Sequence, residues 1–257
     1  PLRLPFWNEK MTPPRVVWED APVLLASDIF HCLYMNYPAS FQTSMLGGSQ
    51  HTLEKYWKEA HPHDPRLANN PLRNTSDFKK TVIPCAIWGD GVPWKKSGVA
   101  QSLDVGTTSS LLGIGDCTWD TRFMMWAFPH DILCTQLEHG VDTMKIVYEL
   151  GLWDWRQLLN GIFAFEDAWG STFDPQSYRG RLVGTQIMGP YRAALLQLRA
   201  DLDWRFKVST LLLGVPMCRR CPRGSVANNA SDGCDVCLPG TYEDNRVSCQ
   251  ACGVDQY

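Results

Sequence analysis

Six of the ten cysteines fall within the last forty residues, and they form three Cys-x-x-Cys pairs. The pairs are Cys218/Cys221, Cys234/Cys237 and Cys249/Cys252. A segment this short and polar buries too little apolar surface to hold a fold by itself. We therefore expect a cross-linked C-terminal module with little regular structure, held by disulfide bonds or by a metal ion.

The spacing allows either disulfides or zinc. The first two pairs, Cys-x2-Cys-x12-Cys-x2-Cys, fit a four-cysteine zinc site. Six cysteines leave one pair over, however, and the segment repeats a similar phrase roughly every fifteen residues. Asn229-Ala230-Ser231 is an N-glycosylation sequon, which suits an oxidising compartment. We predict disulfides, with zinc as the alternative, and the pairing of the six cysteines stays open.

Residues 237–252, CLPGTYEDNRVSCQAC, resemble the extracellular repeats called ephrin-receptor-like, which are cousins of growth-factor-receptor and EGF-like modules. The resemblance implies a disulfide-rich stalk in a secreted or cell-surface protein. Such a stalk has a structural role or contacts a protein ligand.

The composition changes sharply after residue 214, because all eleven tryptophans precede it and Gly, Asn, Asp and Cys dominate beyond it. We predict an irregular, Pro-rich region over residues 1–80, with helices near Ala26–Tyr37 and His51–Ala60. An α/β domain over 81–214 and the cysteine module over 218–257 follow. The chain begins at Pro1 without a methionine, which suggests a fragment or a processed piece.

The bulk numbers describe an ordinary globular chain, with 44% hydrophobic residues and a net charge of −3. That charge gives no overall basic surface for nucleic acid or an anionic membrane. The longest apolar run, near Leu211–Val215, is far too short to cross a bilayer, so we expect no transmembrane segment.

The pattern over residues 81–200 predicts a mixed α/β fold. Thr81–Trp88 is apolar on both faces and stops at Gly89-Asp90-Gly91, which is typical of a central, doubly covered strand. Two more strands are expected over Ser102–Leu112 and Thr121–Phe128. The remaining segments are a helix over Asp131–Leu150, a second over Asp154–Phe165, and Arg192–Ala200, which fits a strand or a helix.

Two aspartates follow the expected strands, Asp90 after the first and Asp201 after Arg192–Ala200. Carboxylates held together by neighbouring strand ends are the ligands that a Mg²⁺-dependent phosphoryl-transfer site needs. The alternative is structural, with Asp90 as a turn residue and Asp201 as a helix cap or a solvated charge.

Three segments resemble the ribonuclease-H-like fold of DDE transposases, and more closely a transposon-like family of protist proteins. They are Val82–Pro93 (VIPCAIWGDGVP), Ser109–Leu112 and Leu198–Trp204 (LRADLDW). The resemblance implies that Asp90 and Asp201 are the first and second Mg²⁺ ligands of an enzyme that cleaves or transfers DNA strands in the nucleus. It also implies a third acidic ligand downstream, where this chain has its cysteine tail, and Gly rather than Ala200 before the second aspartate.

We therefore predict a transposon-derived, nuclease-like fragment that is catalytically inactive and is fused to an extracellular-type cysteine-rich module. The alternative is a non-enzymatic secreted or cell-surface protein whose working part is the tail. A third possibility is a chimeric gene model without a single function.

Overall fold

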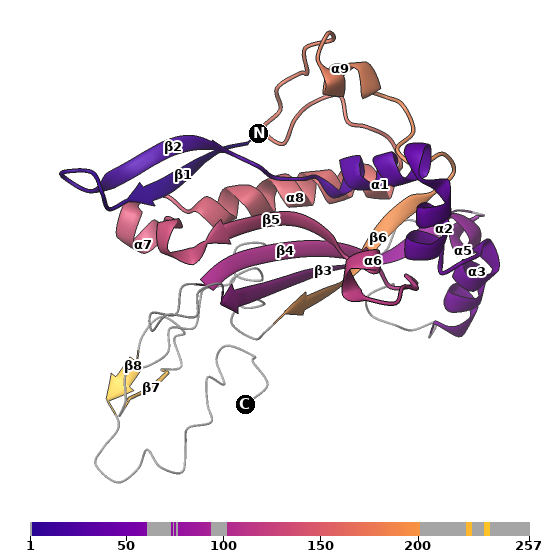
Figure 1. Cartoon of the computed structure of the whole chain (residues 1–257), viewed down its shortest axis with the longest axis horizontal. Helices are drawn as coiled ribbons and strands as arrows, with labels where there is room; N and C mark the ends of the chain where they lie inside the picture. Colours follow the sequence, from indigo (N-terminus) through magenta and orange to yellow (C-terminus); the bar gives the residue numbers. More distant parts are fainter. Residues whose placement is uncertain are drawn as a thin grey trace. The chain divides into compact units, whose positions relative to one another are not determined.

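A computed structural model describes residues 2–60, 73, 75, 77–93, 102–200, and two short strands at 225–227 and 234–236 (Figure 1). The chain divides into two units, Pro1–Arg205 and Phe206–Tyr257, and each is treated by itself. Asp201, Asn229 and five of the six tail cysteines, Cys218, Cys221, Cys237, Cys249 and Cys252, lie outside the described residues.

The centre of the first unit is a four-stranded mixed sheet with the order β5-β4-β3-β6. Its strands are β3 (Val82–Pro93), β4 (Ser102–Ser110), β5 (Phe123–Pro129) and β6 (Arg192–Ala200). Neighbours β3, β4 and β5 run antiparallel, and β6 runs parallel to β3 on its other side. This arrangement confirms the predicted mixed α/β class and shows that Arg192–Ala200 is a strand.

Strand β3 is longer than the sequence predicted, because it continues through Gly89-Asp90-Gly91 to Pro93. Asp90 pairs with Val105 of β4, so the predicted turn after Trp88 is wrong. The prediction that both faces of this strand are covered is confirmed for the first half of β3 only. Residues 82–87 are all buried, whereas Asp90 and Val92 are exposed on one face.

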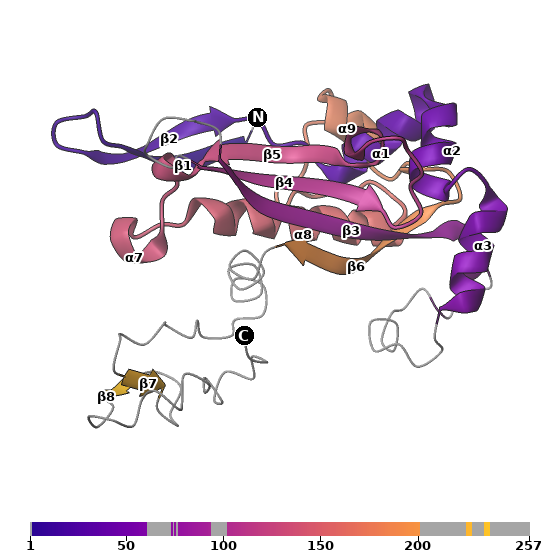
Figure 2. The same ribbon diagram turned by 60° about the horizontal axis from the view of Figure 1, so that its bottom comes forward.

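One face of the sheet packs against α8 (Thr143–Asn160), the longest helix among the described residues (Figures 1 and 2). The Tyr148 ring of α8 meets the Trp126 ring of β5 at a centroid distance of 5.9 Å. The Trp126 indole lies directly over Gly106, where a Cβ would come within 2.1 Å of it. Gly106 is therefore required by the close approach of this indole.

Helix α8 replaces two predicted helices with one. Asp142 caps its start by accepting a hydrogen bond from the Lys145 N–H at 2.9 Å, and Gly161 ends it in a left-handed conformation. The predicted boundaries at Asp131 and Gly151 are wrong, because Gly151 lies inside the helix. Short helices occupy the preceding residues, namely η2 (His130–Ile132) and α7 (Gln136–His139).

The N-terminal region packs onto the sheet and α8. It forms a hairpin, β1 (Leu2–Asn8) with β2 (Arg15–Ala21), and the helices α1 (Ala26–Asn36), α2 (Pro38–Leu46), α3 (Gln50–Glu59) and α5 (Phe78–Thr81). Helices α1 and α3 match the two predicted ones, and the hairpin was not predicted. The Thr143 hydroxyl donates to the Pro5 carbonyl at 2.6 Å, and the Trp57 indole donates to the Val82 carbonyl at 2.6 Å.

The core lies between these layers. Its largest fully buried side chains come from the N-terminal hairpin and helices, the sheet, α8 and the segment after it, namely Leu4, Phe30, Met45, Leu53, Ile83, Met125, Leu158, Phe163, Ile187 and Met188. Two further short helices, α6 (Thr118–Thr121) and α9 (Tyr178–Leu182), lie in the connections before β5 and β6.

In the second unit, β7 (Ser225–Ala227) pairs antiparallel with β8 (Cys234–Val236), and Ala227 lies opposite Cys234. No helix in the described part of the chain is long and apolar enough to cross a membrane, as the sequence predicted.

Candidate functional site

Asp90 lies on the face of the sheet opposite α8. Side chains alternate along a strand, so Trp88, Asp90 and Val92 share one face, and Gly89 faces α8 together with Gly106. Asp90 is exposed, and no other described residue forms a hydrogen bond or an ion pair with its side chain. Within the described part of the chain, no side chain therefore competes with a ligand for this carboxylate.

The residue before Asp201 lies beside the residue before Asp90. Ala200 is the Cα partner of Gly89 across the parallel pair β3–β6. Strand β6 ends at Ala200, whereas β3 continues past Gly89 through Asp90 to Pro93. Asp201 itself lies outside the described residues.

Of the two aspartates that the sequence predicted as metal ligands, Asp90 alone is among the described residues. No group of three or more His, Cys, Asp or Glu side chains is gathered among them. The exposed carboxylate of Asp90 is the hard oxygen donor that Mg²⁺ prefers, so it fits the ion as one ligand of a set.

Two arginines lie against the Trp88 indole on the same face as Asp90. The Arg122 guanidinium carbon is 3.6 Å from the ring centroid, and that of Arg199 is 4.6 Å from it. The indole N–H donates to the Ser109 hydroxyl at 2.9 Å. Sequence reasoning missed this cluster, because its members come from β3, β4, β6 and the residue before β5.

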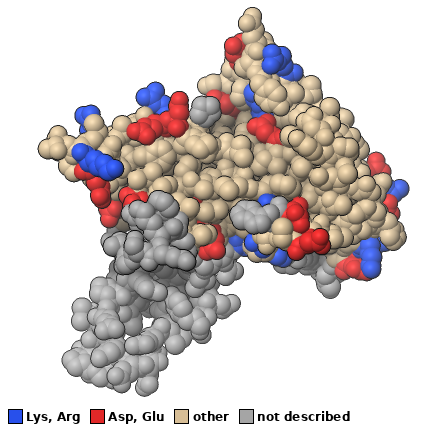
Figure 3. Space-filling view, in the orientation of Figure 1, with Lys and Arg blue, Asp and Glu red and all other residues tan. Residues whose placement is uncertain are grey.

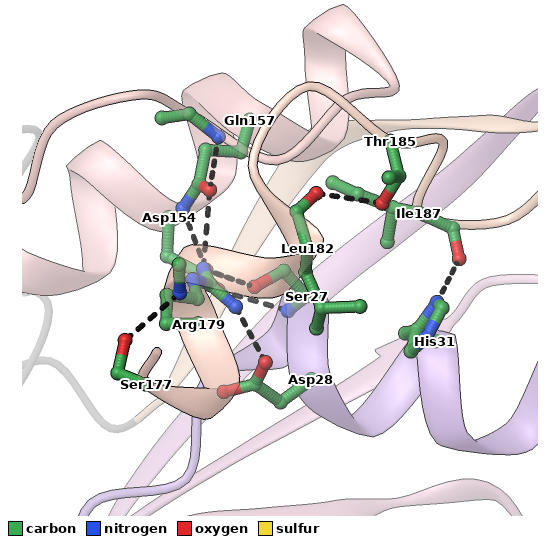
Figure 4. A network of polar contacts seen from close by, with 12 residues as sticks. Ser27, Asp28, His31, Asp154, Gln157, Ser177, Arg179, Leu182, Thr185 and Ile187 are labelled. Carbon is green, nitrogen blue, oxygen red and sulfur yellow. Dashed lines mark hydrogen bonds and ion pairs between the residues drawn. The ribbon is translucent and has the colours of Figure 1, made fainter. Parts of the chain in front are cut away.

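A second polar cluster joins α1, α8 and α9, and Figure 4 shows it from close by. Arg179 of α9 pairs with Asp28 of α1, and its second terminal nitrogen lies 3.7 Å from the Asp154 carboxylate of α8. The same nitrogen donates to the Ser27 hydroxyl and to the Gln157 side-chain oxygen, both at 3.1 Å. The guanidinium also lies over the Phe163 ring at 4.6 Å.

Asp154 is the buried centre of this cluster, with no exposed surface. It accepts hydrogen bonds from the backbone N–H of Ser27, at 3.0 Å, and from the Ser27 hydroxyl. Burial raises the pKa of Asp154 to about 6, and these hydrogen bonds and Arg179 oppose the rise. Burial also raises the pKa of Asp28, against the charges of Arg179 and His31.

This second cluster is a polar network that ties three elements together. His31 contributes at its edge, where its Nδ1 lies 2.7 Å from the Ile187 carbonyl. The polar atoms of Ser27, Asp154 and Gln157 are used in contacts inside the protein, which is the pattern of a structural network. Asp28 and its partner Arg179 are 151 residues apart, so no local sequence pattern links them.

Charges elsewhere are mixed in sign. On the face in Figure 3, basic and acidic side chains are interspersed around a largely uncharged centre. Neither sign of charge dominates this face.

The four cysteines outside the tail are free thiols. Cys85 and Cys134 are buried, and Cys32 and Cys117 are exposed. Burial strongly raises the pKa of Cys85, so it carries no thiolate at neutral pH. In the tail, Cys234 is part of strand β8.

No family model, no curated protein and no solved structure matches this chain. The assignment of function therefore rests on the fold and on the residues themselves.

Proposed function

We propose that residues 82–200 are the ribonuclease-H-like core of a transposon-derived, DDE-type protein, and that Asp90 and Asp201 are its first two metal ligands. The pairing of Gly89 with Ala200 carries this proposal. In the sequence Asp90 follows Gly89 and Asp201 follows Ala200, so the two paired residues each precede an aspartate.

The strand arrangement supports the same assignment. Three consecutive antiparallel strands are followed by α8 and then by β6, which returns beside β3 and parallel to it. The first and fourth strands of the domain are therefore neighbours, as a site built from one carboxylate on each strand requires. The resemblance of Val82–Pro93 and Leu198–Trp204 to the transposon-like family supports Asp90 and Asp201 as the two metal ligands.

The residues of this chain would hold the ion and orient it. Mg²⁺, when bound, supplies activation of a water or hydroxyl nucleophile and stabilises the leaving oxygen. Asp90 offers an exposed carboxylate without a competing cation among the described residues. Asp201 would add the second carboxylate from the neighbouring strand.

We propose that residues 1–257 do not complete the catalytic set. The resemblance calls for a third acidic ligand after Asp201, and the residues that follow carry the cysteine pairs instead. Ala200 also stands where the family tends to have Gly. The expected behaviour is metal binding without strand cleavage.

A second candidate function is favoured by residues 237–252. Their resemblance to ephrin-receptor-like repeats supports a secreted or cell-surface protein in which the tail contacts a protein ligand. In that case Asp90 has no metal to bind, and the α/β unit is a structural domain.

Titration calorimetry with Mg²⁺ on the full chain distinguishes the two candidate functions. The proposal predicts a bound ion whose affinity falls roughly tenfold or more in Asp90→Asn. Asp20→Asn is the matched control, because Asp20 is also an exposed aspartate on a strand. Equal binding by the wild type and Asp90→Asn, or Mg²⁺-dependent plasmid nicking that survives Asp90→Asn, would contradict the metal assignment.

A further inference from the structure

A row of side chains crosses the face of the sheet that carries Asp90. Arg199 of β6 lies opposite Trp88 of β3 in the parallel register, and Arg122, the residue before β5, reaches the same indole. Ser109 of β4 accepts the hydrogen bond from that indole. The arginine row, defined as Arg122, Trp88 and Arg199, thus spans the whole width of the sheet.

Contacts with Gln197 and with the indole hold the row in place. Among the described residues, they leave the terminal nitrogens of Arg199 without an acceptor. The Arg199 Nε donates to the side-chain oxygen of Gln197, two residues earlier on the same face. Stacking on the indole restrains both guanidinium groups, since a cation over an aromatic face is attracted to it. The terminal nitrogens of Arg199 have no acceptor in the part of the chain that the structure describes, and Arg199 is exposed.

Among the described residues, neither arginine is neutralised by an acid. Within residues 2–60, 77–93 and 102–200, no carboxylate forms an ion pair with Arg122 or Arg199. Arg179, by contrast, meets both Asp28 and Asp154. Two uncompensated cations on one indole raise the local potential for an anion in an otherwise mixed surface.

The surroundings of the row are apolar and exposed. Met124 pairs with Thr107 next to Trp88 and is 45% exposed, and Val92 lies two residues beyond Asp90 and is 40% exposed. An isolated phosphate ion would bind the two guanidinium groups without contacting these apolar side chains. A single nucleic acid strand would use both, with phosphates on the arginines and base faces on the apolar surface.

We propose that the arginine row binds the backbone of a single-stranded nucleic acid and leads it past Asp90. This inference deepens the proposed function and rests on it for the assignment of the strand as DNA. Because binding through the arginines needs no metal, it is tested apart from the Mg²⁺ site.

The test measures fluorescence anisotropy of a labelled single-stranded DNA oligonucleotide with the full chain, in EDTA, at several salt concentrations. Arg122→Gln and Arg199→Gln are each expected to weaken binding roughly tenfold. The double variant is expected to lower the slope of log affinity against log salt by about 1.4, since each phosphate contact on a single strand contributes about 0.7.

The control is Arg156→Gln, which removes an exposed arginine from α8 on the other side of the sheet and is expected to change nothing. Arg122→Lys with Arg199→Lys keeps the charges and is expected to keep the salt slope while losing affinity. Circular dichroism verifies that each variant is folded.

Several results would overturn the inference. They are an absence of binding by the wild type, full affinity and an unchanged slope in the double glutamine variant, or an equal loss in Arg156→Gln. Competition by millimolar inorganic phosphate as effective as competition by unlabelled oligonucleotide would also overturn it, because it would reveal a site for the free ion. If the protein binds no Mg²⁺ but still binds the oligonucleotide, the metal site is rejected and the inference about the arginine row stands.

Discussion

Gly89 and Ala200 are partners across the parallel strands β3 and β6, and each of them directly precedes an aspartate in the sequence. The pair is the structural reason to treat Asp90 and Asp201 as one site. The two aspartates are more than a hundred residues apart in the sequence, and the pairing of β6 with β3 is the observation that links them.

Removal of Arg179 is expected to destabilise the first unit strongly. Arg179→Ala leaves the fully buried Asp154 without its cation, and breaking a buried pair in this way costs about 3–5 kcal/mol. Urea unfolding at neutral pH measures the change. Arg181→Ala, an exposed arginine in the same helix, is the control and should stay within about 0.5 kcal/mol of the wild type. Equal stability of the two variants would show that the network does not hold α9.

The same network predicts a pH dependence. Because the pKa of Asp154 is raised from 3.8 to about 6, the folded state holds a proton that the unfolded state has released between these values. The contribution of Asp154 to stability is therefore largest below pH 4 and falls as the pH rises toward 6, by about 1.4 kcal/mol per pH unit at most.

Urea unfolding of the wild type and Asp154→Asn from pH 4 to pH 7 tests this sign. The difference in unfolding free energy between the two proteins should shift in favour of Asp154→Asn as the pH rises. A difference that is flat, or that shifts the other way, would mean that the pKa of Asp154 is not raised.

Gly106 is expected to tolerate no side chain. A Cβ at this position would lie 2.1 Å from the Trp126 indole, and overpacking of this kind costs about 1–3 kcal/mol. Gly91→Ala is the matched control, because Gly91 is also a strand residue and nothing lies within 4 Å of its Cβ position. Thermal unfolding should show a lower midpoint for Gly106→Ala than for Gly91→Ala. Equal midpoints would mean that Trp126 moves aside without cost.

The chemistry of the tail is decided by counting thiols. If the six tail cysteines form disulfides, the denatured and unreduced protein exposes four thiols, those of Cys32, Cys85, Cys117 and Cys134. Ellman's reagent in guanidinium measures this number, and elemental analysis measures zinc in the native protein. Ten reactive thiols together with bound zinc would replace the disulfide prediction by the zinc alternative.

The sequence predicted the sheet better than the helices. A continuous apolar run marked β3, and turn residues separated β4 from β5. The sequence of β6 fitted either a strand or a helix, because the pairing with β3 that makes it a strand is a contact between distant residues. Gly151 was read as a helix end, yet burial of Leu150, Trp155 and Leu158 carries α8 straight through it.

The sites differ in how much the sequence could reveal. Asp90 was found from its place in a strand motif. The Asp154–Arg179 network and the arginine row were not found, since each is assembled by tertiary contacts among residues that show no common spacing. Only the arrangement of β3, β5 and β6 brings Arg122 and Arg199 to one indole.

The most direct test of the central claim is a double-mutant cycle on Mn²⁺ affinity with Asp90→Asn, Asp201→Asn and the double variant, followed by electron paramagnetic resonance of the free ion. If the two aspartates hold one ion, each single change should remove most of the binding, and the double change should add little to it. Two losses that add independently, or a wild-type protein that binds no Mn²⁺, would contradict the assignment of Asp90 and Asp201 to one metal site.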